Sequence, residues 1–179
     1  MVKIKISAIF APKLKESRKS HGFTQKEISE EIGITRTSLC NYETGAREPD
    51  IETLAQLSEF YGISTDFLIG ITMDKSFIEW SFEEKAPLSK WNGRKIKTTC
   101  FPERLRIARA KKNLSQYKVA NKLNIKRSSI AKYELGKAQP SIETLARLCI
   151  FYDVRANWLL GLEDDARFTD EESNQKGEQ

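Results

Sequence analysis

The chain has 179 residues, with 30 Lys and Arg against 25 Asp and Glu and a formal net charge of +5, a length that fits two small domains and a connector. No apolar run could cross a bilayer, and residues 1–10 lack the apolar core of a signal peptide. The three cysteines form no CxxC pair and His21 is the one histidine, which excludes a recognisable zinc site and argues against a disulfide framework. We therefore expect a soluble, cytoplasmic protein without metal or other cofactor.

The chain contains an internal repeat. Residues 10–71 align with residues 101–162 without a gap at a constant offset of 91, and about a third of the aligned positions are identical. Two copies of this length are two small domains, since a solenoid needs about three shorter repeats to close its core. We call them the first repeat and the second repeat. The predicted organisation is a first domain at 1–71, a connector at 72–99, a second domain at 100–162 and an acidic, disordered tail at 163–179.

Each repeat is predicted to fold as five short helices, which makes the fold mainly α. In the first repeat the helices are expected at 12–21, 25–32, 36–44, 51–61 and 65–69, with Pro12 in the first turn of the first helix. Thr24, Thr35 and Asp50 are the expected N-caps. The second repeat has the same boundary signals at Ser115, Lys126, Ser141 and Gly161.

The connector differs from the repeats in composition. Phe77, Ile78, Trp80 and Phe82 partly alternate with polar residues, and Asn92-Gly93 is a strong hairpin signal. Residues 94–99 also resemble residues 3–7. These patterns predict a small antiparallel β element that involves both segments. The alternative is a flexible linker, against which the large aromatic side chains argue.

The second and third expected helices of each repeat are separated by a tight turn. The turn residue is Gly33 in the first repeat and Asn124 in the second. A left-handed backbone suits such a turn; glycine adopts it freely and asparagine tolerates it better than most residues. Apolar residues at matching positions of both copies predict a shared core. This pattern indicates a helix-turn-helix, whose second helix lies in the major groove of DNA.

Each repeat resembles a lambda-repressor-like (Cro/XRE-type) helix-turn-helix domain over about 60 residues. The resemblance rests on four shared features: T/S-Q at the start of the second helix, Y-E-x-G closing the third, then P-x-I-E-T-L, and a final F/W-L-x-G. It implies binding of operator DNA and, in most members, repression of transcription. Such domains usually work as two-fold dimers on paired half-sites. This chain departs from that pattern by carrying two domains covalently.

The third expected helix of each repeat is the one that would lie in the major groove, and we call it the recognition helix. Its exposed face offers side chains that can read bases, because Arg pairs bidentately with guanine and Asn with adenine. The predicted base readers are Arg36, Thr37, Ser38 and Asn41 in the first repeat and Arg127, Ser128, Ser129 and Lys132 in the second. The resemblance places Gln25 and Gln116 near phosphate at a helix N-terminus. Further predicted phosphate contacts are Thr24, Lys26, Ser115, Tyr117 and Lys118.

Other shared residues are interpreted as structural. The resemblance implies that Arg18 pairs with Glu43, and Arg109 with Glu134, which would orient each recognition helix. The turn residues Gly33 and Asn124 belong to the same structural set. The sequence contains no nucleophile–base arrangement and no phosphate-binding loop, so no enzymatic activity is expected.

Charge divides the two repeats. Residues 100–162 carry 13 Lys and Arg against 4 Asp and Glu, whereas residues 1–71 carry 9 against 10. The leading hypothesis is a sequence-specific regulator of bacterial or mobile-element type, a monomer acting as an intramolecular pseudo-dimer on double-stranded DNA with two imperfectly matched half-sites. In the alternative, only the basic second domain binds DNA and the first is a protein-interaction or dimerisation module. A homodimer formed through the connector's aromatic residues is a further alternative.

Overall fold

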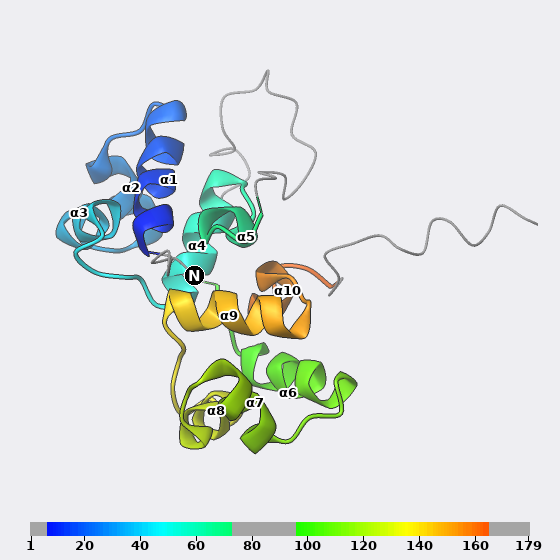
Figure 1. Cartoon of the computed structure of the whole chain (residues 1–179). Coiled ribbons are helices and arrows are strands. Elements are labelled where there is room, and N and C mark those ends of the chain that lie inside the picture. The colour runs from blue at the N-terminus through cyan, green and yellow to red at the C-terminus, as the bar shows by residue number, and fades with distance from the viewer. Residues whose placement is uncertain (1–6, 73–95, 165–179) are drawn as a thin grey trace, which may run out of the picture.

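The computed structural model describes residues 7–72 and 96–164. Within these ranges the chain forms ten α-helices, five in each repeat (Figure 1). In chain order they are α1 (Ser7–Ser20), α2 (Gln25–Ile32), α3 (Arg36–Thr44), α4 (Ile51–Tyr61), α5 (Thr65–Leu68), α6 (Phe101–Lys111), α7 (Gln116–Leu123), α8 (Arg127–Glu134), α9 (Ile142–Tyr152) and α10 (Ala156–Leu160). The predicted mainly α fold of two helix-turn-helix units is confirmed.

Local capping interactions explain why three helices of the first repeat begin where the sequence predicts. The Thr24 hydroxyl accepts a hydrogen bond from the Glu27 N–H, and the Glu27 carboxylate accepts one from the Thr24 N–H at 2.7 Å. The Thr35 side chain caps α3 and the Asp50 side chain caps α4 in the same manner. Such caps satisfy backbone N–H groups that have no partner within the helix.

The first helix is longer than predicted. It begins at Ser7, five residues before the expected start at Pro12, and Pro12 lies inside it. Proline removes one backbone hydrogen bond, whose acceptor would be the carbonyl of the exposed residue Ala8. The extra turn carries Phe10, which is 1% exposed in the core. Burial of this ring stabilises a turn that the local sequence disfavours.

The predicted β element is wrong where the structure describes it. Ser7 is the first residue of α1, and residues 96–98 form no regular structure. Ile96 and Thr98 are buried, and the Thr98 carbonyl accepts a hydrogen bond from the Phe101 N–H. Residues 98–101 therefore turn into α6 instead of extending a strand. The Asn92-Gly93 hairpin and the aromatic run at 77–82 lie outside the described residues.

The last described residues belong to the second repeat's fold. The Asn157 amide donates to the Glu163 carboxylate at 2.9 Å, and Arg104 contacts Asp164 at 3.2 Å. Of the predicted acidic tail, Glu163 is therefore held by a side-chain contact, the Asp164 side chain is fully exposed, and residues 165–179 lie outside the described part. No helix in the described ranges is long and apolar enough to cross a membrane.

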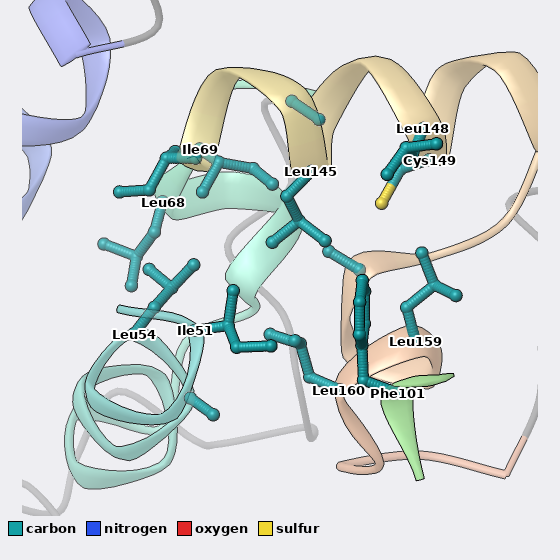
Figure 2. Close-up of a cluster of buried hydrophobic side chains, with 14 of the residues drawn as sticks. Ile51, Leu54, Leu68, Ile69, Phe101, Leu145, Leu148, Cys149, Leu159 and Leu160 are labelled. Atoms are coloured by element: carbon teal, nitrogen blue, oxygen red, sulfur yellow. The ribbon is translucent and has the colours of Figure 1, made fainter. Parts of the chain in front are cut away.

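The middle of the molecule is built from the last two helices of each repeat. Figure 1 shows α4, α5, α9 and α10 between the α1–α3 group and the α6–α8 group. In that view α3 and α8 lie toward the same side of the molecule, in its two outer parts. Apolar side chains from both repeats meet in one cluster, in which those of α4 and α5 face those of α9 and α10 (Figure 2). The core is thus continuous from one repeat to the other.

Candidate nucleic-acid interface

Both helix-turn-helix units make their turn with a left-handed residue. Gly33 ends α2 at φ 76°, and Asn124 ends α7 at φ 49°. Below each turn the helices pack on buried apolar side chains, among them Ile28 and Leu39 in the first repeat and Val119 and Ile130 in the second. The two copies therefore present α3 and α8 in equivalent ways.

On α3, the predicted base readers differ in accessibility. Arg36 and Thr37 are exposed, whereas Ser38 and Asn41 are partly buried. The Ser38 hydroxyl lies 2.8 Å from that of the N-cap residue Thr35. Arg36 and Thr37 are thus open to a ligand, while Ser38 already has a partner within the helix cap.

On α8, Arg127, Ser128 and Lys132 are exposed and Ser129 is partly buried. The N-cap residue here is Lys126, whose side chain makes no capping hydrogen bond. The second repeat therefore replaces the neutral cap Thr35 with a cation and the amide Asn41 with the cation Lys132. The basic character of this repeat extends along its recognition helix.

An arginine–glutamate bridge ties the first helix of each repeat to its recognition helix. Arg18 Nε donates to Glu43 Oε1 at 2.6 Å and Arg18 Nη2 to Glu43 Oε2 at 2.9 Å, and Arg109 and Glu134 repeat both distances. Burial raises the pKa of Glu43, but hydrogen bonds from Arg18 and Gln25 more than offset it, so the pKa lies below its ordinary value. The pairs that the resemblance implied are present in both copies.

The glutamines predicted near phosphate are anchored to these same carboxylates. Gln25 Nε2 donates to Glu43 Oε2 at 3.0 Å, and Gln116 Nε2 to Glu134 Oε2 at 3.0 Å. In the first repeat, Gln25 lines an open groove together with Arg18, Phe23, Thr24, Lys26 and Arg36. This groove brings the predicted phosphate residues of α2 beside the first predicted base reader of α3.

The N-terminal turns of α2 and α7 differ in charge. In the first repeat Glu27 occupies the capping box, and hydrogen bonds from the Thr24 backbone and hydroxyl lower the pKa of its carboxyl group. The equivalent residue of the second repeat is the exposed Lys118, next to Tyr117, whose side chain is 63% exposed. The first turn of α2 thus combines the ammonium group of Lys26 with the carboxylate of Glu27, whereas that of α7 carries the ammonium group of Lys118 and no carboxylate, which favours an anion more.

Four further residues on or near these helices, two tyrosines, a cysteine and the histidine, are partly or fully buried. Tyr42 is buried and Tyr133 is partly buried. Cys40 on α3 is a free, partly buried thiol. His21 Nδ1 lies 2.6 Å from the Ser17 carbonyl at the end of α1. Among the described residues no cluster of His, Cys, Asp or Glu could hold a metal ion.

Sequence reasoning missed a set of polar contacts between the two repeats. At the start of α4 the Ile51 N–H donates to Gln139 Oε1 at 3.4 Å, and at the start of α9 the Ile142 N–H donates to Glu48 Oε2 at 3.2 Å. Glu48 and Gln139 are separated by the repeat offset of 91, as are Ile51 and Ile142. Each repeat therefore caps a helix of the other through the same position.

A second reciprocal pair joins α5 and α10. The Ala156 N–H donates to Asp66 Oδ1 at 2.7 Å, and the Thr65 N–H donates to Asn157 Oδ1 at 2.9 Å. These positions again differ by the offset of 91. Contacts in which position i of one unit touches j of the other, and j touches i, are the pattern of a two-fold interface. Asp66 and Asn157 were detectable in the sequence as the acidic residue and the amide at equivalent positions of two short, largely apolar helices.

Comparison with known proteins agrees with this geometry. A family model described as helix-turn-helix matches twice, at residues 14–68 and 105–159. The chain belongs to the Cro/XRE-type helix-turn-helix family. The two matches cover the helix-turn-helix units of both repeats, together with most of the helices that pack against them.

Several curated relatives match one part of the chain. The transcriptional regulator ImmR of Bacillus subtilis is 48% identical over 58 residues, which is 32% of this chain and 46% of ImmR. The SPbeta prophage-derived regulator YonR of the same organism is 44% identical over 61 residues, 34% of this chain and 56% of YonR. The phage CTXphi repressor RstR of Vibrio cholerae is 31% identical over 55 residues, 31% of this chain and 50% of RstR. The chain thus spans about half the length of these relatives, and no solved structure matches it significantly.

Proposed function

We propose that this protein is a sequence-specific, double-stranded DNA-binding transcription regulator that acts as an intramolecular pseudo-dimer. One recognition helix, α3 or α8, enters the major groove at each half-site. Because the two helices carry different side chains, the half-sites are similar without being identical. Their centres lie about 34 Å, one helical turn, apart or a multiple of it.

The observation that carries this proposal is the reciprocal set of inter-repeat contacts. Helix-turn-helix domains of this kind read paired half-sites when a two-fold interface spaces their recognition helices. Here the contacts of Glu48 with Ile142 and of Gln139 with Ile51 follow a two-fold pattern inside one chain. The direction of regulation is proposed to be repression, supported by the relative named as a phage repressor and by a prophage-derived regulator, both similar to one part of this chain.

Base reading is assigned by exposure and chemistry. Arg36 and Arg127 stand at equivalent exposed positions and favour guanine in both half-sites. One turn later, Asn41 favours adenine while the equivalent Lys132 favours guanine or phosphate. Thr37, Ser38, Ser128 and Ser129 complete the base-reading set. The phosphate set is Thr24, Gln25, Lys26, Ser115, Gln116, Tyr117 and Lys118, which positions the protein without reading sequence.

A second candidate is favoured by one observation, the charge difference at the start of α2 and α7. Glu27 disfavours a phosphate where Lys118 attracts one. In this second candidate only the second repeat binds DNA tightly, and the first is a protein-interaction module. Arg36, Thr37 and Asn41 argue against it, because their side chains suit base reading: Arg pairs bidentately with guanine and Asn with adenine.

The test is in vitro selection from a random DNA library with the intact protein. It is repeated with Arg36→Ala/Asn41→Ala and with Arg127→Ala/Lys132→Ala. The matched control is Lys15→Ala/Arg106→Ala, which removes two exposed cations at equivalent positions of α1 and α6.

Under the pseudo-dimer proposal, the intact protein enriches two sequence elements at fixed spacing, and each recognition-helix variant loses a different one. A lost bidentate contact weakens binding by about 1–3 kcal/mol at that position only. The control keeps both elements. A single enriched element that survives Arg36→Ala/Asn41→Ala would contradict the proposal and favour the second candidate.

A further inference from the structure

The two reciprocal contacts between the repeats share a feature that the reading of DNA does not require. At both positions the first repeat supplies a carboxylate and the second supplies the amide of the same length. Glu48 of the first repeat is equivalent to Gln139 of the second, and Asp66 is equivalent to Asn157. An Asp and an Asn have the same shape, as do a Glu and a Gln, and an oxygen of each can accept these backbone hydrogen bonds. The two repeats therefore differ at these positions in the charge of the accepting side chain.

The pair at Asp66 and Asn157 is deeply buried, at 3% and 1% exposure. Besides the Ala156 N–H, Asp66 accepts a hydrogen bond from the Asn157 N–H at 3.4 Å. The Asn157 side chain in turn accepts from Thr65, the residue before Asp66. The two side chains therefore reach across the interface to each other's backbone, and two charges placed there would lie close together in a site shielded from water.

Two like charges that lie close together raise the free energy of the folded state when both are removed from water. If the face of one first repeat met that of another, a second Asp66 carboxylate would take the place of the Asn157 amide, and a second Glu48 carboxylate the place of the Gln139 amide. When the first repeat meets the second, each of these equivalent positions combines one carboxylate with one neutral amide. Glu163 and Arg155 are the other charged groups that act on Asp66.

We infer that the carboxylates of Glu48 and Asp66, matched with the amides of Gln139 and Asn157, select the partner of the first repeat's α4–α5 face. That face accepts the second repeat and rejects a second copy of the first repeat. The four residues act as pairing-specificity determinants, and their effect on pairing can be measured without DNA.

The second repeat has a local reason to carry the amide. The Asn157 Nδ2 group donates to Glu163 Oε1 at 2.9 Å, which a carboxylate at position 157 could not do. The residue of the first repeat equivalent to Glu163 is Thr72, which carries no charge. Swapping the acid and the amide between positions 66 and 157 without breaking this bond therefore needs Glu163→Gln. A glutamine at position 163 can accept a hydrogen bond from Asn157 and can donate one to an aspartate at that position.

The experiment uses the full-length chain with Glu163→Gln and compares four arrangements at positions 66 and 157. These are the natural Asp66 with Asn157, the exchanged Asp66→Asn/Asn157→Asp, the double acid given by Asn157→Asp alone, and the double amide given by Asp66→Asn alone. The double acid reproduces a pairing of first repeat with first repeat inside one chain. Hydrogen exchange of the Thr65 and Ala156 amides near neutral pH reports on the two inter-repeat hydrogen bonds.

The double acid is expected to exchange these two amides at least about tenfold faster than the natural arrangement, since two buried carboxylates that interact shift each other by about a pKa unit or more. The exchanged arrangement is expected to restore most of the lost protection, and the double amide to stay closer to natural than the double acid. The inference would be overturned if the two amides exchanged hydrogen as fast in Asp66→Asn/Asn157→Asp as in the double acid. The effect would then belong to the substitution at position 157 alone. Equal protection in all four would overturn it as well.

A second set covers the case in which a buried variant fails to fold. Gln139→Glu, Glu48→Gln and their combination act in the natural background at an exposed position, Gln139, and at a partly buried one, Glu48. Here Gln139→Glu is expected to speed exchange of the Ile51 and Ile142 amides, and the combination to reverse that change. Additive effects of the two substitutions would contradict the inference.

Discussion

Removing the arginine of one inter-helix bridge gives the sharpest test of how the recognition helix is held. In Arg18→Met, Glu43 loses the bonds from Arg18 Nε and Nη2 and keeps only Gln25 Nε2 at 3.0 Å. The Phe23 carbonyl loses its bond from Arg18 Nη1 at 2.9 Å. A nearly buried carboxylate is then left without its countercharge.

The expected cost follows from the burial of the pair. The side chain of Glu43 is 1% exposed and that of Arg18 is 12% exposed, so solvent screens little of their interaction. Breaking a buried pair by removing one partner costs about 3–5 kcal/mol, whereas an exposed pair contributes at most about 1 kcal/mol. The equivalent Arg109→Met should cost slightly less, because the Arg109 side chain is 22% exposed.

Urea unfolding followed by circular dichroism measures this cost as a change in midpoint at constant slope. The matched control is Arg18→Met/Glu43→Leu, which removes both charges. It should recover at least about half of the lost stability, since an apolar replacement of both partners is nearly neutral. A loss below about 1 kcal/mol for Arg18→Met would refute the reasoning, and so would a double variant no more stable than the single one.

Three further predictions concern the turn, the bridge and the interface. Gly33→Ala should lower the free energy of unfolding by about 1–2 kcal/mol through its left-handed backbone alone, because no atom lies within 4 Å of the added methyl group. Gly33→Asn should lower it by less, and the midpoints of urea unfolding measure both changes. The pKa of Glu43 is lowered in the folded state, so its stabilisation is complete above its ordinary value of 4.5 and is lost as the pH falls through the folded value; the stability gap between the natural protein and Glu43→Gln should narrow in that acid range, and a gap that widens there would contradict the sign. Leu160→Ala should cost about 2–5 kcal/mol because the side chain is 1% exposed in the inter-repeat cluster, whereas Ile150→Ala, at 63% exposure, should change the unfolding free energy by less than about 0.5 kcal/mol.

The sequence predicted best what is decided locally. The bounds of α2, α3 and α4 follow from the caps Thr24, Thr35 and Asp50, each of which bonds a backbone N–H three residues on. The start of α1 was missed because it depends on the burial of Phe10 against residues distant in the chain. The β element predicted to include residues 94–99 is wrong at the described residues 96–99 for a similar reason, since Ile96 and Thr98 are buried by packing that their local pattern does not encode.

The candidate interface divides in the same way. The bridge of Arg18 with Glu43 came from the family resemblance, and the exposure of Arg36 came from its place on the helix. The inter-repeat contacts of Asp66 and Asn157 were not predicted, because they join positions that only the arrangement of the repeats brings together. Comparing the two copies for acid-to-amide differences would have marked these positions as unusual.

If both repeats read half-sites as proposed, their union in one chain changes how operator binding depends on the abundance of the protein. Separate subunits must first associate into a dimer. When the protein is scarce, the concentration of that dimer is therefore proportional to the square of the subunit concentration. Here the two units belong to one chain, and Asp66 and Asn157 hydrogen-bond them to each other, so no association between separate chains is needed. Under the proposed mode of binding, operator occupancy rises in simple proportion to the number of chains. Such a regulator gives a graded response without a threshold, and remains effective at a few copies per cell.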